Sequence, residues 1–102
     1  MFDEVKHVHM IGAGGIGISA IGKWFLARGV AVSGSDVVAS SITDDLRKRG
    51  AKIALGHDTK NIPDGCDLVV YTEAADEENI ERAEATRRKI RQLGHFDFLG
   101  KL

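Results

Sequence analysis

Five glycines fall between residues 9 and 25, in the stretch HMIGAGGIGISAIGKWF, and this cluster restricts the fold more than any other feature of the chain. An apolar run at 5–11 leads into the glycines, and residues 16–28 after them have apolar side chains at helical spacing. Glycine weakens the interior of a helix or strand, but at a turn it allows backbone angles that other residues avoid. The stretch therefore predicts a strand, a tight turn and a helix in succession.

The remainder of the chain continues to alternate between strand and helix patterns. Glycine follows each of the first two predicted helices, at the position where a C-cap is expected. Strands that alternate with helices pair in parallel through right-handed crossovers. We therefore expect residues 1–102 to form a single α/β domain, a Rossmann-like three-layer fold with a parallel sheet. The later predicted elements are strands at 30–36, 51–55 and 67–72, helices at 40–50 and 76–90, and a helical turn at 96–102.

The composition excludes several classes of protein. The 102 residues carry 14 Lys and Arg against 15 Asp and Glu, a net charge of −1, so no basic field indicates nucleic acid or membrane as a partner. A single cysteine cannot form an internal disulfide, which favours a reducing compartment. No signal peptide is apparent, and no apolar run approaches the about 18 residues of a membrane span. These features predict a soluble, cytoplasmic domain.

The glycines also have a spacing that is typical of phosphate binding. Gly12, Gly14 and Gly17 match Gly-x-Gly-x-x-Gly, in which the glycines allow the turn, the approach of the backbone to a phosphate, and close helix packing. The N–H groups at the start of the helix then face the anion. We expect this loop to bind a phosphate, with a purely structural turn as the alternative. The expected contacts are Gly12, Ala13, Gly14, Gly15, Ile16 and Gly17.

An acidic residue ends the second predicted strand. Asp36 lies 19 residues after Gly17, where dinucleotide-binding domains place the carboxylate that accepts hydrogen bonds from ribose hydroxyls. Judged by these residues alone, an NAD(P)-binding module of a dehydrogenase or of a regulatory sensor is favoured. An aspartate that caps a turn is the alternative.

The stretch VHMIGAGGIGISAIGKWFLARGVAVSGSD resembles the N-terminal domain of the Mur ligase family. The double glycine followed by Gly-x-Ser, together with Gly-Ser-Asp at the end of the second strand, is far more specific than glycine spacing alone. The similarity continues through SSITDDLRKRGAKIALGHD and NIPDGCDLVVYTEAADEENIE, and so covers nearly the whole chain. The matching residues of the first stretch are His9, Gly12, Gly14, Gly15, Gly17, Ser19, Gly34, Ser35 and Asp36.

The resemblance implies that the domain binds the uridine diphosphate of a sugar nucleotide rather than NAD(P). Within the family the similarity is closest to ligases that join L-alanine to UDP-N-acetylmuramate for peptidoglycan synthesis, so this UDP-sugar is the expected ligand. A pyrophosphate at a helix N-terminus serves either nucleotide. The resemblance adds further UDP contacts at Ser35, Asp36, His57, Thr72 and Ala74.

Three residues depart from the family pattern on the sugar side of the expected site. Glu73 stands where the family has a small residue or proline, and it adds a negative charge beside the expected diphosphate. Gly94 and His95 stand at positions where the family has arginine. These departures bear on how the sugar is recognised.

The residues that would bind ATP are absent from this sequence. The family activates a carboxylate with ATP and Mg²⁺, which requires a P-loop ending in Gly-Lys-Ser or Gly-Lys-Thr. No such tripeptide occurs in the 102 residues. We therefore expect an isolated N-terminal domain of a longer ligase, with no catalytic residue, metal or cofactor of its own. ATP, Mg²⁺ and a central ATPase domain would belong to the parent ligase.

Overall fold

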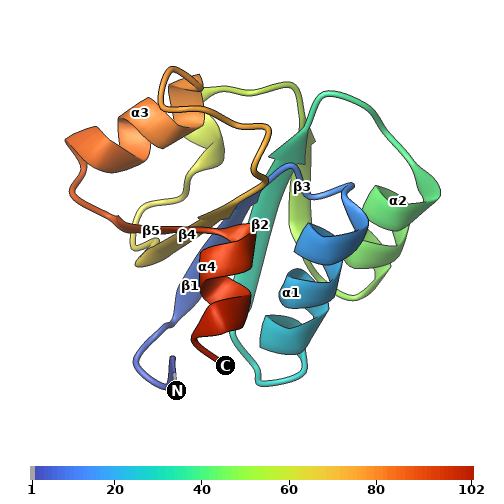
Figure 1. The fold of residues 1–102 in the computed structure, drawn as a ribbon. Helices are drawn as coiled ribbons and strands as arrows, with labels where there is room; N and C mark the ends of the chain where they lie inside the picture. The colour runs from blue at the N-terminus through green and yellow to red at the C-terminus, as the bar shows by residue number, and fades with distance from the viewer. Residues whose placement is uncertain (1) are drawn as a thin grey trace.

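The computed structural model describes residues 2–102, which form a five-stranded sheet with helices around it (Figure 1). The strand order is β3-β2-β1-β4-β5, and every neighbouring pair is parallel. The elements are β1 (His7–Ile11), α1 (Ile16–Leu26), β2 (Ala31–Asp36), α2 (Ser41–Lys48), β3 (Lys52–Leu55), the 3₁₀ helix η1 (Thr59–Asn61), β4 (Leu68–Tyr71), α3 (Ile80–Arg87), β5 (Arg91–Gly94) and α4 (His95–Gly100). The predicted Rossmann-like α/β fold is confirmed, with β1 at the centre of the sheet.

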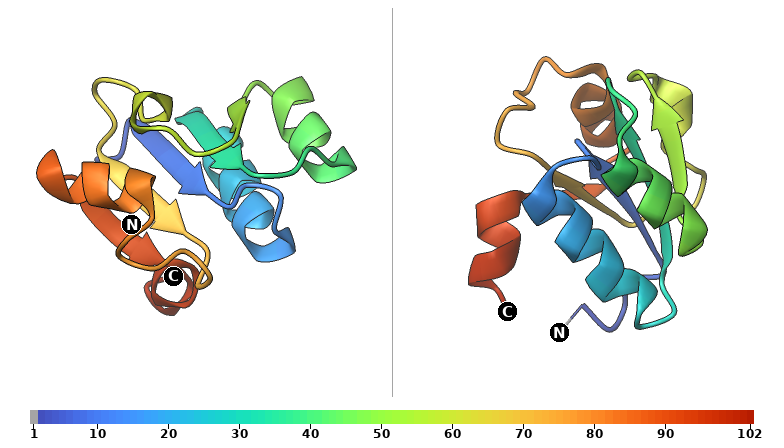
Figure 2. Two further views of the ribbon diagram at one scale, coloured as in Figure 1. Left: turned by 90° about the horizontal axis from the view of Figure 1, so that it is seen from above. Right: turned by 90° about the vertical axis from the view of Figure 1, so that its right-hand side faces the viewer.

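Helices lie on both faces of the sheet and complete the three layers (Figure 2). On one face, Phe25 of α1, Leu46 of α2 and Phe98 of α4 share a hydrophobic core. On the other face, Ile62 after η1 and Ala85 of α3 belong to a second, smaller core. None of the helices within residues 2–102 has both the length and the apolar character needed to cross a membrane.

Alternation along the strands places different chemistry on the two faces. Val8 and Met10 of β1 belong to the core under α1, whereas Ile11 belongs to the core under α3. Because successive side chains of a strand point to opposite faces, His9 shares the α3 face with Ile11. Ser33 joins His9 on this face by a hydrogen bond, and both residues are buried. The α3 face of the central strands is therefore partly polar.

The ends of the helices follow local capping rules. Ser40 forms a capping box with Thr43 at the start of α2, and Gly50 follows this helix with a φ of +104°. Asn79 accepts hydrogen bonds from two N–H groups at the start of α3. The prediction of a helix over 76–90 was therefore too long, because the asparagine cap starts α3 at Ile80.

One strand was not predicted from the pattern of the sequence. β5 lies at the edge of the sheet and pairs with β4, with Leu93 opposite Val70. Its other residues are Arg91, Gln92 and Gly94, so neither a continuous apolar run nor clear alternation marks it. The helical turn predicted after it is confirmed as α4.

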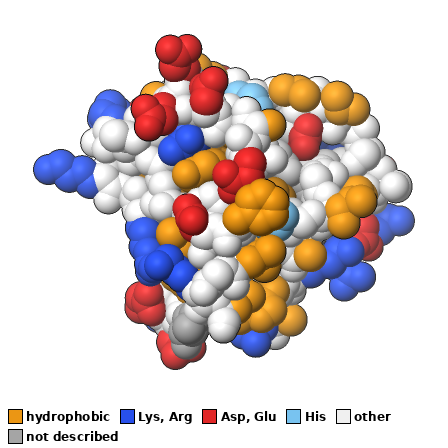
Figure 3. Space-filling view, viewed as in Figure 1, with side chains coloured by type: hydrophobic (Ala, Val, Ile, Leu, Met, Phe, Trp, Pro, Cys, Tyr) orange, Lys and Arg blue, Asp and Glu red, His pale blue; other side chains and the backbone are white. Residues whose placement is uncertain are grey.

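Hydrophobic side chains gather on the surface over α4 and the neighbouring part of α1 (Figure 3). A groove of about 270 Å³ lies there, between Ala20 and Trp24 of α1 and Phe98 and Leu99 of α4. Phe98 is fully buried at its base, whereas Leu99 is 46% exposed.

Candidate functional site

The glycine loop joins the carboxyl end of β1 to the start of α1 and is held from two sides. Gly12 has a φ of +87°, and a Cβ there would lie 2.6 Å from Cγ2 of Thr72, so a side chain does not fit. The N–H groups of Gly12 and Ala13 both donate to the carbonyl of Ser35, each at 2.9 Å. The N–H of Gly15 donates to the carbonyl of Gly12 at 3.0 Å. The loop is thus fixed against the ends of β2 and β4.

The N-terminus of α1 is open to an anion. Gly15 is the N-cap, and no side chain caps this helix. The first N–H of α1 to bond back is that of Ser19, which donates to the Gly15 carbonyl at 2.8 Å. The N–H groups of Ile16 and Gly17 lie before that point, where a helix supplies no acceptors of its own. These N–H groups and the helix dipole favour a negative charge here.

Asp36 lies against the glycine loop from the end of β2. Its Oδ2 accepts a hydrogen bond from the N–H of Gly14 at 2.8 Å, and its Oδ1 accepts one from the N–H of Val38 at 3.3 Å. A Cβ on Gly14 would come within 2.9 Å of Oδ2. The carboxylate therefore positions the loop, and its predicted contact with a nucleotide remains a prediction.

A pocket of about 280 Å³ opens beside the loop, at the carboxyl edge of the sheet. β1 lies between β2 and β4, and the chain crosses from one side of it to the other, which makes this the switch point where such folds bind ligands. Six of the predicted site residues line the pocket: Gly12, Gly15, Asp36, His57, Thr72 and Ala74. The pocket therefore brings together residues from four separate segments of the chain.

The other predicted site residues lie outside this lining. Ala13 is fully buried in the core under α1, and Ser35 is fully buried behind the pocket. Their side chains are therefore enclosed by protein, and their predicted contacts with UDP remain predictions. Gly14 faces Asp36, while Ile16 and Gly17 belong to the first turn of α1.

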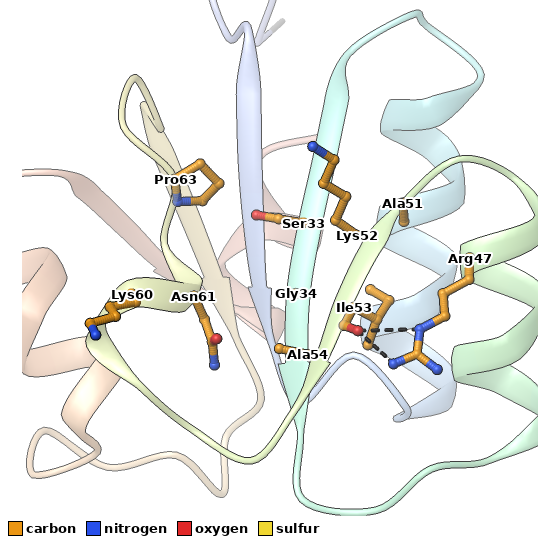
Figure 4. A pocket seen from close by; sticks show the side chains of 10 residues that line it. All are labelled: Ser33, Gly34, Arg47, Ala51, Lys52, Ile53, Ala54, Lys60, Asn61 and Pro63. Carbon is orange, nitrogen blue, oxygen red and sulfur yellow. Dashed lines mark hydrogen bonds between the residues drawn. The ribbon is translucent and has the colours of Figure 1, made fainter.

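A larger hollow of about 480 Å³ lies elsewhere, along β2 and β3 next to η1 (Figure 4). Lys52 and Lys60 are among the residues that line it. Arg47 reaches across from α2 and donates to the carbonyl of Ile53 at 2.6 Å, which covers part of the edge strand. No residue of the glycine loop lines this hollow, so it is separate from the candidate site.

A buried carboxylate lies directly behind the pocket. Glu81, the second residue of α3, is 0% exposed. Its Oε1 accepts hydrogen bonds from Nε2 of His9 at 2.6 Å and from the hydroxyl of Ser35 at 2.8 Å. Its Oε2 accepts from the N–H of Asp58 at 3.0 Å and from Nδ2 of Asn61 at 2.8 Å. One carboxylate thus joins β1, β2, the loop after β3 and α3.

The environment keeps this carboxylate charged. Burial alone would raise the pKa of Glu81, but the hydrogen bonds from His9, Asn61 and Ser35 outweigh it and lower the pKa to about 2. His7 lies further from the site, and its pKa is lowered mainly by burial. Within residues 2–102, no group of three or more His, Cys, Asp or Glu is arranged to hold a metal ion.

His57 connects the buried carboxylate to the pocket. Its Nδ1 lies 3.0 Å from Oγ of Ser35 and 3.4 Å from Oε2 of Glu81. Its side chain is 23% exposed and lines the pocket. Glu81 was not among the predicted site residues. Its position two residues after the helix cap Asn79 is a local signal that could have identified it.

The three departures from the family pattern lie together near the N-termini of α1 and α4. Oε2 of Glu73 accepts a hydrogen bond from the N–H of Phe96 at 3.2 Å. A Cβ on Gly94 would lie 2.7 Å from the same oxygen. The ring of His95 packs so closely over Gly17 that a Cβ there would overlap it. Glu73 is thus directed at α4, and it is not among the residues that line the pocket.

Comparison with known proteins establishes the family. Residues 7–102 match the family model described as Mur ligase family, catalytic domain. The chain belongs to the Mur ligase family. A UDP-N-acetylmuramate–L-alanine ligase of Clostridium botulinum is 44% identical to it over 100 residues, which is 98% of this chain. The corresponding ligase of Acetivibrio thermocellus is 45% identical over 100 residues.

Solved structures of Mur ligases have the same fold. The UDP-N-acetylmuramate-alanine ligase MurC of Thermotoga maritima superposes with a TM-score of 0.87 at 31% identity, over 91% of this chain and 21% of that chain. A murein peptide ligase of Psychrobacter arcticus gives a TM-score of 0.84 at 23% identity, which supports the fold alone. The chain spans about a fifth of the length of the curated relatives that it matches, 22% and 21% for the two named above.

These comparisons confirm the resemblance to Mur ligases that the sequence motifs indicated. The relatives named above are UDP-N-acetylmuramate–L-alanine ligases by name, not nicotinamide dehydrogenases. The NAD(P) alternative, which rested on glycine spacing and Asp36 alone, is therefore not favoured.

Proposed function

We propose that this Mur ligase domain binds the UDP moiety of UDP-N-acetylmuramate, as the N-terminal substrate-binding domain of a ligase that adds L-alanine during peptidoglycan synthesis. The observation that carries the proposal is the pocket at the carboxyl edge of the sheet, which six of the predicted site residues line beside an uncapped helix N-terminus. The 44% identity to a UDP-N-acetylmuramate–L-alanine ligase supports this choice of nucleotide.

The two parts of the nucleotide meet different chemistry in this proposal. The diphosphate lies at the start of α1, where the N–H groups of Ile16 and Gly17 and the helix dipole stabilise its charge. The uridine lies in the pocket beside Asp36, His57 and Thr72. Because backbone dipoles rather than a basic cluster hold the anion, we expect added salt to weaken binding modestly.

The chemistry of ligation requires more than these residues. The sequence has no Gly-Lys-Ser or Gly-Lys-Thr, and the described residues have no metal-binding cluster, so they do not fit ATP and Mg²⁺. We infer that ATP and Mg²⁺ act in a central ATPase domain of a longer ligase, which is the partner of this domain in the cytoplasm. The domain supplies nucleotide binding, and no catalytic step is assigned to it.

Titration calorimetry of residues 1–102 tests this function directly. UDP and UDP-N-acetylmuramate should each bind saturably with one site per chain, and NAD should give no saturable heat. Stronger binding of UDP-N-acetylmuramate than of UDP would show that Glu73 and His95 still allow contact with the sugar. Saturable binding of NAD without binding of UDP would overturn the proposal.

A further inference from the structure

Two hydrogen bonds connect Glu81 to the pocket, one between Glu81 and Ser35 and one between Ser35 and His57. The direction of the first determines the direction of the second. A carboxylate only accepts hydrogen bonds, so the hydroxyl of Ser35 donates its single hydrogen to Oε1 of Glu81 at 2.8 Å. The oxygen of Ser35 is then an acceptor toward Nδ1 of His57, which lies 3.0 Å away. Nδ1 of His57 must therefore carry a hydrogen.

This assignment determines the chemistry of the other ring nitrogen of His57. A neutral imidazole carries one hydrogen, so a ring protonated at Nδ1 has an acceptor at Nε2. Nδ1 is turned inward to Ser35 and Glu81, which leaves the opposite edge of the ring for the pocket. No residue within 2–102 makes a hydrogen bond to Nε2 of His57. The pocket thus presents a hydrogen-bond acceptor at this position.

We propose that Glu81 is a positioning residue that, acting through Ser35, fixes His57 as a hydrogen-bond acceptor toward the nucleoside. The inference rests on the proposed binding of a uridine nucleotide and adds the direction of one contact. The complementary ligand group is a donor. Uridine offers two kinds, N3–H of the uracil and the hydroxyls of the ribose.

The second oxygen of Glu81 controls where the histidine lies. Oε2 accepts from the N–H of Asp58 and from the side chain of Asn61, at 3.0 and 2.8 Å. Asn61 also donates to the carbonyl of Gly56 at 2.9 Å, so both sides of His57 in the chain are fixed. The carboxylate therefore sets the position of the loop as well as the protonated nitrogen of the ring.

Glu81→Gln separates this role from packing, because the amide has nearly the same shape as the carboxylate. Asp58 and Asn61 both donate, so the glutamine oxygen should take the Oε2 position and its NH₂ the Oε1 position. That NH₂ donates one hydrogen to Ser35 and the other to Nε2 of His9, whose own hydrogen moves to Nδ1 beside the hydroxyl of Ser33. The hydroxyl of Ser35 is then free to donate to Nδ1 of His57. The hydrogen on the ring moves to Nε2, and the acceptor in the pocket becomes a donor.

Nitrogen-15 NMR of the imidazole rings tests the assignment without any nucleotide. At a pH of about 8, His57 of the wild type should carry its hydrogen on Nδ1. In Glu81→Gln the hydrogen should move to Nε2. Glu84→Gln is the matched control on the same helix, because Glu84 bonds to Arg87 and Arg88 and makes no contact with His57. A wild-type ring protonated at Nε2, or at both nitrogens, would overturn the proposal.

Titration with UDP then tests whether the effect of Glu81 on UDP affinity depends on the ring of His57. Glu81→Gln should weaken UDP binding about tenfold, whereas in a His57→Ala background the same substitution should have little further effect. An equal loss in both backgrounds would show that Glu81 acts through the fold alone and would contradict the proposal.

Two UDP analogues identify the donor in the ligand. A diphosphate of 3-methyluridine lacks N3–H, and 2′-deoxy-UDP lacks one ribose hydroxyl. The wild type should bind the analogue without the donor about tenfold more weakly than it binds UDP. His57→Ala should bind that analogue and UDP with equal affinity. Equal affinity of the wild type for UDP, for both analogues and for 3′-deoxy-UDP, which lacks the other ribose hydroxyl, would refute the acceptor role. Failure of the wild type to bind UDP at all would instead refute the proposed function, while the ring NMR would still report the role of Glu81.

Discussion

Gly15 is the residue at which nucleotide binding can best be separated from folding. Its φ of −70° and ψ of 145° are open to any residue, and it lines the pocket. The nearest atom to an added Cβ is the carbonyl oxygen of Gly12, at 3.3 Å. We predict that Gly15→Val lowers UDP affinity by at least about tenfold, because its side chain blocks the approach to the start of α1, with a loss of stability of about 1 kcal/mol.

Calorimetry and thermal unfolding of Gly15→Val check this prediction, with Gly100→Val as the control. An added Cβ at Gly100 meets nothing within 4 Å, and Gly100 lies in α4, outside the pocket. Unchanged UDP affinity in Gly15→Val would argue against a phosphate at this loop. Gly14→Val is less informative, since its side chain would push Asp36 away and disturb the loop itself.

The lowered pKa of Glu81 makes the stability of the fold depend on pH in the acid range. Its pKa falls from an ordinary 4.5 to about 2 on folding, so its contribution is complete above pH 4.5 and is lost as the pH falls toward 2. The size of the shift corresponds to roughly 3 kcal/mol. Denaturant unfolding at a series of pH values should therefore show a shallower acid loss of stability in Glu81→Gln than in the wild type.

A second carboxylate, Glu84, also contributes to the pH dependence of stability, so its share must be measured separately. Its pKa is also lowered to about 2, through hydrogen bonds from Arg87 and Arg88, so it contributes over the same range of pH. Glu84→Gln reports that share separately. Parallel acid profiles for the wild type and Glu81→Gln would contradict the assigned charge state of the buried carboxylate.

At the scale of elements, the cap of α2 should affect stability without affecting binding. Ser40 accepts a hydrogen bond from the N–H of Thr43 at 3.3 Å, and Thr43 returns one by accepting the N–H of Ser40 at 2.9 Å. Ser40→Ala removes the hydrogen bond from the N–H of Thr43 to the Ser40 side chain. This loss should lower the free energy of unfolding by about 1 kcal/mol. Urea unfolding measures the loss, and UDP affinity should stay at the wild-type value because Ser40 does not line the pocket. A variant as stable as the wild type would show that the box is dispensable.

At the scale of the whole molecule, binding and ligation should be separable. Residues 1–102 mixed with UDP-N-acetylmuramate, L-alanine, ATP and Mg²⁺ should release no phosphate above background, since no P-loop is present to bind ATP. A phosphate-release assay checks this, and calorimetry on the same sample shows that the nucleotide site is intact. Release that depends on both the UDP-sugar and alanine would contradict the prediction.

Features that depend on neighbours in the sequence could be predicted with no structure. The strand, glycine turn and helix at residues 7–26, the glycine after α2 and the serine cap at Ser40 all follow from backbone angles and hydrogen bonds within a few residues. Apolar periodicity identified β1, β2, β3 and β4, but β5 is an edge strand with one large apolar residue, and it forms because β4 offers a free edge. The order of capping residues, rather than periodicity, decided where α3 begins.

The sequence by itself determined a parallel α/β domain with a phosphate-type glycine loop, and its motifs identified the Mur ligase family. The tertiary structure decided what surrounds the loop: that Asp36 bonds to Gly14, and that Glu81 bonds to His9 and Ser35. Glu81 lies 72 residues from His9 and 46 from Ser35, a separation at which no local pattern links them. Strand register and the packing of α3 bring these side chains together, and burial then makes each of them depend on its partners for hydrogen bonds.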